Sequence, residues 1–260
     1  MTRALAIIPA RLASSRLARK MLLEARGLPL FAHTARNTQA SGAFARVVLA
    51  TDAHEILERA RELGLEALLT RADHTSGTDR VHEAWLALAR AGERAEVVVN
   101  VQGDEPELDP RDLAALVAAF GDARVRAATL AAPLEDPALC ARPNVVKVVV
   151  DRNGDALYFS RAPIPADGHA AAESGPGTNK TIHRRHIGVY AFAPAALEQF
   201  CALPRGVYEM RENLEQLRWL EAGERLRVVP ATHAPVGIDT REDFERFRAR
   251  LEGERRGRSG

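Results

Sequence analysis

A cationic segment follows the first apolar stretch of the chain. Within IIPARLASSRLARK (7–20), Arg11, Arg16 and Lys20 follow two isoleucines and are interspersed with two serines. Guanidinium groups pair with phosphate oxygens in a bidentate manner, and a lysine adds a compact positive charge. Ligands of open α/β sheets bind beyond the carboxyl ends of the strands, so this spacing favours a triphosphate-binding loop. A solvated basic turn has the same composition and is the alternative.

Two acidic residues follow other apolar stretches. In VNVQGDEP (99–106), Gly103 and Asp104 come directly after an apolar run, and Gly103 permits close approach of another backbone. Asp239 precedes a helix that Thr240 can cap by itself. Because carboxylates are typical ligands of Mg²⁺, the two aspartates and the basic loop together predict a metal–triphosphate site. The alternatives are a plain strand-ending turn and a favourable charge at a helix N-terminus.

The composition limits the classes of function. The chain has 260 residues, of which 46% are hydrophobic and 27% charged, and its formal net charge is +1. No overall basic field therefore indicates nucleic acid as a partner. The two cysteines, Cys140 and Cys201, form neither a disulfide framework nor a zinc pattern. No run reaches the roughly 18 apolar residues of a membrane span. We expect a cytoplasmic globular protein with no membrane or nucleic-acid partner.

Alternating strands and helices are expected to position these residues. Three apolar runs predict strands buried on both faces, as in a parallel sheet. They cover 4–10, 46–51 and 96–102. Apolar residues at helical spacing predict helices over 53–63, 77–92 and 109–120. Asp52 is expected to cap the first of these helices and Gly64 to end it. This alternation is typical of a doubly wound α/β fold.

The second half of the chain has a different pattern. Residues 145–151 and 156–161 predict a β-hairpin around an Asn-Gly turn, and 186–192 predict a further strand. One long helix is predicted over 212–223. Residues 166–181 are rich in glycine, alanine and polar side chains, which indicates a surface loop.

Eight segments resemble, in order, one family, the 3-deoxy-manno-octulosonate cytidylyltransferases. They are IIPARLASSRLARK, LATD, TRADHTSGTDR, VNVQGDEP, ALYFSRAPIP, RHIGVYAF, NLEQLRWLEAGERLRV and GIDTREDFER. The resemblance covers nearly the whole chain, and TRADHTSGTDR together with VQGDEP is quite specific. It implies that CTP and 3-deoxy-manno-octulosonate (Kdo) are converted to CMP-Kdo and diphosphate, for lipopolysaccharide biosynthesis.

The resemblance also implies an architecture. The family fold is a three-layer, Rossmann-like nucleotidyltransferase α/β fold with a mostly parallel sheet. A single domain would cover 1–252, and 253–260 would be a flexible tail. A β-rich insertion at about 155–205 would serve sugar binding and formation of a homodimer.

Individual residues take roles from the same resemblance. The residues implied in catalysis are Arg11, Lys20, Asp104 and Asp239, of which the two aspartates would bind Mg²⁺. The residues implied in CTP binding are Arg11, Arg16, Lys20, Arg71, Ser76, Gly77 and Arg80. The residues implied in sugar binding are Gln102, Arg161, His186, Glu212 and Gln216. By themselves, Ser76 would be interpreted as a helix cap and His186 as a core histidine.

One segment departs from the family pattern. At the end of the basic segment the family has the sequence R-L-P-G-K, whereas this chain has Leu17-Ala18-Arg19-Lys20, so the proline and the glycine are both replaced. Arg19 therefore stands where a residue with unusual backbone geometry is expected.

Two other functions stay open from the sequence. The first is transfer of CMP to a related acidic sugar, either 8-amino-Kdo or a nonulosonic acid. The second is an inactive nucleotide-binding homologue, for which the altered loop before Lys20 is the supporting feature.

Overall fold

The chain folds into two compact units. The computed structural model describes residues 2–13, 17–166 and 182–257, without the side chains of 254–257. The first unit consists of Met1–Val117 and Pro235–Gly260, and the second of Ala118–Ala234. The second unit extends beyond the insertion predicted at about 155–205, and the single domain over 1–252 stays a prediction. Among the described residues, no helix combines the length and the apolar character needed to cross a membrane.

The first unit is built on four parallel strands in the order β6-β1-β4-β5. These strands are β1 (Ala4–Ala10), β4 (Arg46–Thr51), β5 (Glu66–Leu69) and β6 (Val97–Asn100). Its α-helices are α1 (Leu30–Ala40), α2 (His54–Glu62), α3 (Gly77–Arg90), α4 (Pro110–Ala118, whose last residue belongs to the second unit) and α9 (Arg241–Gly257). Short elements are the 3-10 helix η1 (Lys20–Leu22) and the hairpin of β2 (Glu24–Ala25) and β3 (Leu28–Pro29).

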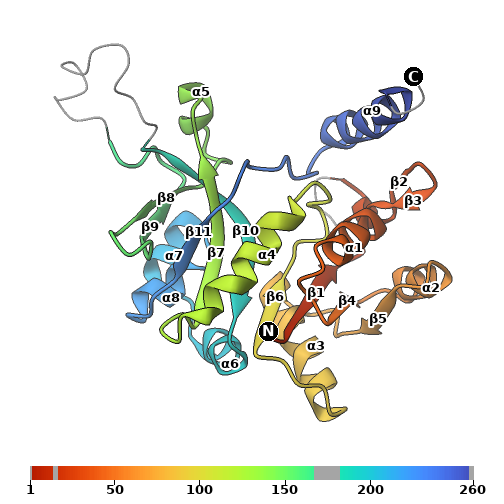
Figure 1. The fold of residues 1–260 in the computed structure, drawn as a ribbon, viewed down its shortest axis with the longest axis horizontal. Helices are drawn as coiled ribbons and strands as arrows, with labels where there is room; N and C mark the ends of the chain where they lie inside the picture. The colour runs from red at the N-terminus through yellow and green to blue at the C-terminus, as the bar shows by residue number, and fades with distance from the viewer. Residues whose placement is uncertain (1, 14–16, 167–181, 258–260) are drawn as a thin grey trace. The chain divides into compact units, whose positions relative to one another are not determined.

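The central strands of this sheet are apolar at consecutive positions and lie between two layers of helices. Ile7 and Ile8 of β1 and the valines 97–99 of β6 are completely buried. In Figure 1, α1 and α2 lie above these strands and α3 lies below them. The strands are therefore covered on both faces, which explains why their sequences are apolar at consecutive positions. The α/β class with a mostly parallel sheet, predicted from the sequence, is confirmed.

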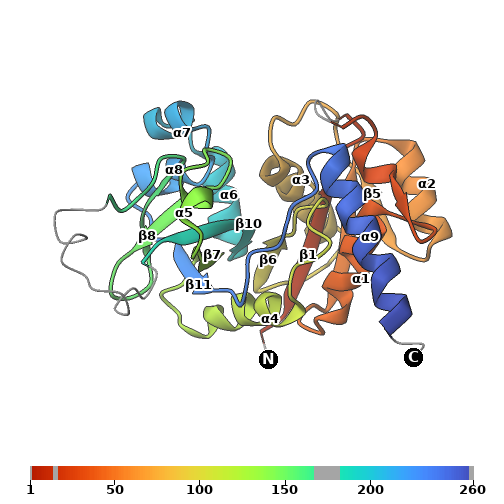
Figure 2. The same cartoon turned by 90° about the horizontal axis from the view of Figure 1, so that it is seen from above.

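The C-terminal helix α9 packs on the first unit. The rings of His33 in α1 and Phe247 in α9 meet edge to face with centroids 5.2 Å apart, and the two helices lie side by side in Figure 2. A reciprocal cap begins α9, since the Asp243 amide donates to Thr240 Oγ1 and the Thr240 amide donates to the Asp243 carboxylate. The predicted cap is thus confirmed. The helix runs to Gly257 and so includes the first five residues of the predicted tail.

The second unit contains a mixed sheet with the strand order β11-β7-β10-β8-β9. Its strands are β7 (Ala127–Pro133), β8 (Lys147–Val150), β9 (Ala156–Ser160), β10 (Arg184–Phe192) and β11 (Arg227–Pro230). Its helices are η2 (Ala119–Gly121), α5 (Pro137–Cys140), α6 (Pro194–Ala202), α7 (Val207–Glu212) and α8 (Leu217–Glu221). The β11–β7 pair is parallel, and the other pairs are antiparallel. The predicted hairpin is β8–β9, with Gly154 at φ +84° in its turn.

Two local predictions are wrong. Of the single helix expected over 212–223, only α8 and the last residue of α7 are helical, because Asn213 adopts a left-handed conformation at φ 52° and ends α7 where the predicted helix was to begin. Asp52 does not cap α2, whose N-cap is Ala53, and its carboxylate instead binds other segments. Gly64, at φ +69° after the helix, ends α2 as predicted.

Candidate active site

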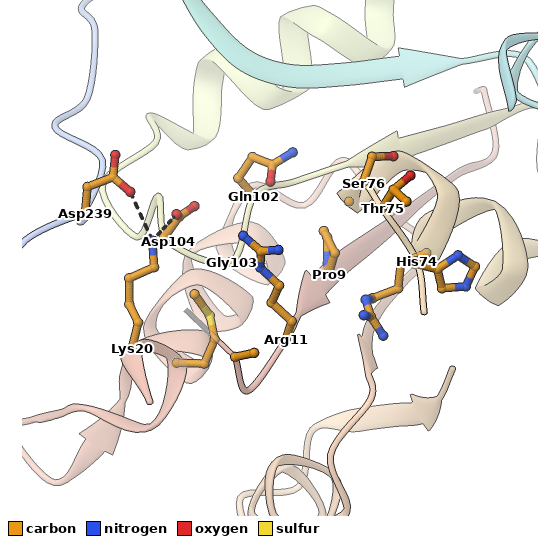
Figure 3. A pocket seen from close by; sticks show the side chains of 14 residues that line it. Pro9, Arg11, Lys20, His74, Thr75, Ser76, Gln102, Gly103, Asp104 and Asp239 are labelled. Atoms are coloured by element: carbon orange, nitrogen blue, oxygen red, sulfur yellow. Dashed lines mark hydrogen bonds and ion pairs between the residues drawn. The ribbon is translucent and has the colours of Figure 1, made fainter. Parts of the chain in front are cut away.

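A pocket lies at the carboxyl ends of β1 and β6 in the first unit (Figure 3). The chain moves from β1 outward to β4 and β5 and then returns to β6 on the other side of β1. Such a reversal of strand order is where open α/β sheets form their ligand crevices. The pocket is lined by Pro9, Arg11, Ala13, Lys20, Met21, His74, Thr75, Ser76, Gly77, Arg80, Gln102, Gly103, Asp104 and Asp239.

Lys20 joins two of the acidic residues predicted from the sequence. Its ammonium donates to Asp104 Oδ2 at 2.5 Å and to Asp239 Oδ1 at 3.2 Å, as the dashed lines in Figure 3 mark. The amide of Ile238 also donates to the backbone oxygen of Asp104 at 2.9 Å, which holds the two loops together. Lys20 is 8% exposed, and this burial is compatible with a charge because two carboxylates surround it. Residues separated by more than 200 positions therefore form one charged group.

The donor chemistry of this group fits Mg²⁺. Asp104 and Asp239 offer carboxylate oxygens, and their side chains are 27% and 41% exposed. Within the described part of the chain, no three histidine, cysteine or acidic side chains gather in a way that could hold a metal by themselves. Mg²⁺ is commonly bound by one or two carboxylates, with water and substrate phosphates completing its shell. Two carboxylates that line the same pocket as Arg11 and Lys20 meet that requirement.

Gly103 is needed because backbone passes close to it. A Cβ atom at this position would lie 2.9 Å from the backbone oxygen of Pro9 and 3.1 Å from the sulfur of Met21. Contacts this short force the neighbours to move, and a backbone oxygen has little freedom to do so. The glycine predicted to permit close approach does so here, between the ends of β1 and β6.

A loop and the first turn of α3 form the opposite wall. Ser76 caps this helix, since its Oγ accepts from the Asp79 amide at 3.1 Å. Free N–H groups at the start of a helix favour negatively charged ligands. Arg11 is exposed, and Figure 3 shows its guanidinium pointing into the pocket toward Gln102. The pocket therefore combines an open cation with a helix N-terminus.

His74 is a pocket residue that was not singled out from the sequence. Its ring is hydrogen-bonded through Nε2 to the carboxylate of Glu83, which also accepts from the Arg71 amide. Burial alone would raise the pKa of Glu83, but these hydrogen bonds outweigh it and lower the pKa. The available signal was the position of His74 inside TRADHTSGTDR, nine residues before an acid on the following helix.

The two arginines of the same segment differ. Arg80 is 3% exposed and donates to Thr70 Oγ1 at 2.6 Å, to the Arg71 backbone oxygen at 3.1 Å and to Asp52 Oδ2 at 3.0 Å. Arg71 is exposed, pairs with Asp73 at 3.2 Å and does not line the pocket. Direct contact of either arginine with a nucleotide stays a prediction.

The structure thus brings together most of the residues proposed for the nucleotide and the metal. The predicted residues that line the one pocket are Arg11, Lys20, Ser76, Gly77, Arg80, Gln102, Asp104 and Asp239. Arg16 lies outside the described residues, as does most of the 166–181 loop. Gln102, proposed for the sugar, belongs to this pocket in the first unit, whereas the other four sugar candidates belong to the second unit.

Those four candidates and Ser160 are together called the polar cluster of the second unit, and three of its members, Ser160, Arg161 and Glu212, are joined by hydrogen bonds. Arg161 donates through its guanidinium to the backbone oxygens of Pro143 (3.0 Å), Glu212 (2.6 Å) and Asn213 (3.2 Å). The Glu212 carboxylate accepts from Ser160 Oγ at 2.7 Å and from the Arg161 amide at 3.0 Å. These contacts tie α7 to the end of β9. A sugar-binding role for either side chain stays a prediction.

The other two members of the polar cluster are buried. His186 is 9% exposed, with its Nε2 2.9 Å from Thr129 Oγ1, and burial lowers its pKa to about 3. It is therefore neutral at physiological pH. Gln216 is 2% exposed and accepts from Tyr190 Oη at 3.0 Å, while its Nε2 has no hydrogen-bond partner among the described residues. An amide donor left unpaired in a buried position is costly unless a ligand or water completes it.

Comparisons with known proteins agree with this geometry. Residues 5–226 match the family model of the cytidylyltransferases. A 3-deoxy-manno-octulosonate cytidylyltransferase from Nitratidesulfovibrio vulgaris (strain DP4) is 48% identical over 239 residues, which cover 92% of each chain. Another protein of that name, from Acidobacterium capsulatum, is 45% identical over 92% of this chain and 93% of its own.

A solved structure extends the likeness to three dimensions. It is described as CMP:2-keto-3-deoxy-manno-octonic acid synthetase complexed with CTP, and it is 36% identical with a TM-score of 0.87. The match covers 97% of this chain and 100% of that one. With the family match spanning the parallel sheet of the first unit and most of the second unit, this chain belongs to the 3-deoxy-manno-octulosonate cytidylyltransferases within the cytidylyltransferase family.

Proposed function

We propose that this protein transfers CMP from CTP to Kdo, giving CMP-Kdo and diphosphate for lipopolysaccharide biosynthesis. The observation that carries the proposal is the pocket of the first unit, where cations and two carboxylates meet at the reversal of strand order in a chain of this family. The same pocket would be unusual for an apolar ligand, because charged and polar side chains make up much of its lining.

The reaction forms one bond to phosphorus and breaks another. The anomeric hydroxyl of Kdo attacks the α-phosphorus of CTP in line, a new sugar oxygen–phosphorus bond forms, and the bond to the β-phosphate bridging oxygen breaks as diphosphate leaves. Such a transfer depends on positioning and on neutralisation of charge more than on covalent help from the protein. The side chains of the pocket therefore need to bind and orient rather than to react.

Arg11 and Lys20 supply the positive charge in this proposal. A nucleoside triphosphate carries about four negative charges, and fixed cations stabilise the charge that collects on the leaving diphosphate. Lys20 is already held by Asp104 and Asp239, so its ammonium is placed before CTP arrives. The start of α3, with Ser76 and Gly77, would face the nucleotide from the opposite wall.

We assign the metal role to Asp104 and Asp239. When bound there, Mg²⁺ would supply Lewis-acid neutralisation of phosphate oxygens and would acidify the attacking hydroxyl. The fit rests on their carboxylate oxygens and their place in the pocket beside the cations.

Sugar binding is proposed for the polar cluster of the second unit, and Gln102 is a separate candidate in the pocket of the first unit. The unpaired Nε2 of Gln216 is a buried donor suited to a sugar hydroxyl. Neutral His186 can exchange hydrogen bonds with hydroxyls without introducing a charge. We also propose that the protein acts in the cytoplasm as a homodimer, as implied by the family resemblance.

Diphosphate release by purified protein tests the function. The assay contains CTP, Kdo and Mg²⁺, with each component omitted in turn and with ATP, UTP and GTP replacing CTP. We expect release only when all three components are present and CTP is the nucleotide. Release with 8-amino-Kdo or a nonulosonic acid but not with Kdo would assign a different sugar. CTP-dependent thermal stabilisation without any release would instead indicate an inactive nucleotide-binding homologue.

A further inference from the structure

Asp52 lies immediately after β4 and has each carboxylate oxygen bonded to a different segment of the first unit. Oδ1 accepts from the amide of Leu12, in the basic loop that follows β1, at 3.1 Å. Oδ2 accepts from Arg80 Nη2, on α3, at 3.0 Å. A residue expected to cap α2 is therefore occupied with two other segments, and neither contact serves that helix.

Arg80 extends the connection to a third segment. Its Nη1 donates to Thr70 Oγ1 at 2.6 Å and to the Arg71 backbone oxygen at 3.1 Å, where the 70–76 loop leaves β5. The amide of Thr70 also donates to the backbone oxygen of Thr51 at 2.8 Å, directly before Asp52. The ends of β1, β4 and β5 are thus connected to the start of α3 through one buried ion pair.

From this geometry we propose that the Asp52–Arg80 pair is a positioning device that fixes residues 11–13, the described start of the basic loop, and the 70–76 loop relative to each other before CTP binds. Arg11, next to Leu12, and Ser76, at the end of the second loop, line the same pocket. The inference rests on the proposed function, because the expected effect of the pair is on the binding of CTP and is exerted through these loops. It assigns to Asp52 a role in the reaction although Asp52 does not line the pocket.

The residue types suit that role. A carboxylate accepts from two donors at once, and a guanidinium presents several donors in a rigid fork. The side chains are 13% and 3% exposed, so solvent screening of the pair is weak. A pocket that is already ordered loses less conformational freedom when the ligand binds, and ligand affinity rises accordingly.

Asp52→Asn is the informative substitution, because an asparagine offers one oxygen and one NH₂ group. Either the Leu12 amide or the Arg80 guanidinium must then face a donor instead of an acceptor. Arg80→Lys is the second variant, since a lysine keeps the charge but cannot reproduce the fork. It also replaces Asp52→Asn as the test if that protein fails to fold.

Glu93→Gln is the matched control. The Glu93 side chain is 9% exposed and pairs with Arg46, at the opposite end of β4, and with Arg3 at 2.7 Å. The control therefore breaks ion pairs of another buried carboxylate against the same strand, at the end away from the pocket, although its partners Arg46 and Arg3 are 34% and 56% exposed. If Asp52→Asn acts only by lowering the stability of the fold, Glu93→Gln should produce the same changes.

Three measurements are made below the melting temperature of each variant: hydrogen exchange of the Leu12 amide without ligand, Kd for CTP by calorimetry, and KM for each substrate. For Asp52→Asn we expect faster exchange at Leu12 and a rise of about tenfold in Kd and KM for CTP, the size typical of losing a hydrogen bond to a charged group. We expect an unchanged KM for Kdo. Arg80→Lys should show the same pattern, and Glu93→Gln should match the wild type.

Asp52→Asn with wild-type Leu12 exchange, or with an unchanged Kd for CTP despite faster exchange, would overturn the positioning role. A KM for Kdo that rises as much as that for CTP would also overturn it, since a general loss of structure then explains the result. Wild-type protein that neither binds CTP nor releases diphosphate overturns the proposed function instead. In that case Leu12 exchange still decides whether the pair fixes the basic loop.

Discussion

The pocket of the first unit and the polar cluster of the second use their charged groups differently. In the pocket, Arg11 is exposed, and the charged group around Lys20 opens to the ligand space. In the cluster, the guanidinium of Arg161 is bonded to three backbone oxygens. The donor of the cluster that has no partner among the described residues is the Nε2 of a neutral residue, Gln216. A charged side chain in a family motif therefore does not by itself identify a ligand contact, and an unpaired donor or an exposed cation is the better candidate for one.

The largest effect should come from removing one carboxylate of the pocket. Asp104→Asn should lower turnover by at least about a thousandfold, the upper range for loss of one electrostatic contact in an active site. The fold should persist, because Lys20 keeps Asp239 as a partner. Steady-state diphosphate release and circular dichroism check the two statements.

Glu107→Gln is the control for that change. Glu107 lies three residues further along and pairs with Arg250 through a contact of 2.8 Å, outside the pocket lining. Its turnover should equal that of the wild type. Substantial activity in Asp104→Asn would contradict the metal role of this residue and weaken the contrast between the two regions.

The second prediction concerns His186 in the polar cluster. Its pKa is about 3 in the folded chain, against an ordinary value of 6.5. Between these values the unfolded chain binds a proton that the folded chain does not, so stability is fully present above pH 6.5 and falls as the pH drops toward 3. The contribution lost between pH 7 and pH 5 is about 2 kcal/mol.

Urea unfolding of the wild type and His186→Gln at both pH values isolates this contribution. Glutamine can still bond Thr129 but does not titrate, so its stability should fall by about 2 kcal/mol less between pH 7 and pH 5. An equal loss of stability in the two proteins between pH 7 and pH 5 would mean that the pKa of His186 is the same in the folded and the unfolded chain.

Gln216 offers the third test, of intermediate size. Gln216→Met keeps the length of the side chain but removes the unpaired Nε2 donor, and KM for Kdo should rise about tenfold while KM for CTP stays the same. Tyr190→Phe is the matched control, because it removes the bond to Gln216 Oε1 and leaves the Nε2 donor in place. A rise for Tyr190→Phe as large as for Gln216→Met would assign the effect to packing and not to the free donor.

The smallest effect is expected at the altered loop of the first unit. Arg19 has φ 54° and ψ 31°, a left-handed conformation that costs a non-glycine residue about 1 kcal/mol. Its guanidinium pairs with Glu55 on the surface, a contact worth at most about 1 kcal/mol. Arg19→Gly should therefore change the free energy of unfolding by less than about 1 kcal/mol and leave turnover unchanged.

Arg19→Ala completes that comparison, because it loses the ion pair and keeps the backbone cost. It should be less stable than Arg19→Gly by about 1 kcal/mol in thermal or urea unfolding. An alanine variant as stable as the glycine variant would mean that the left-handed conformation carries no cost in this loop.

The sequence predicts best what depends on near neighbours. The strand over 4–10 follows from consecutive apolar residues, and Lys20 and Asp104 follow from short motifs at strand ends. The boundary at Asn213 was missed because the flanking residues continue a helical pattern, and only the observed backbone reveals the left-handed residue. The contacts of Asp52 and Arg161 were also not predicted, since each forms with partners dozens of positions away. Contacts over such separations leave no local periodicity to recognise.

Arg19 bears on how the family of this chain is recognised. A pattern of residue types does not match the segment before Lys20, because the segment lacks both the proline and the glycine of the family pattern. The backbone conformation at Arg19 nevertheless suits the glycine of that pattern, since its φ and ψ lie in the region that glycine populates most readily. At this position the chain thus departs from the family pattern in residue type, while its backbone keeps a conformation that a glycine would adopt readily.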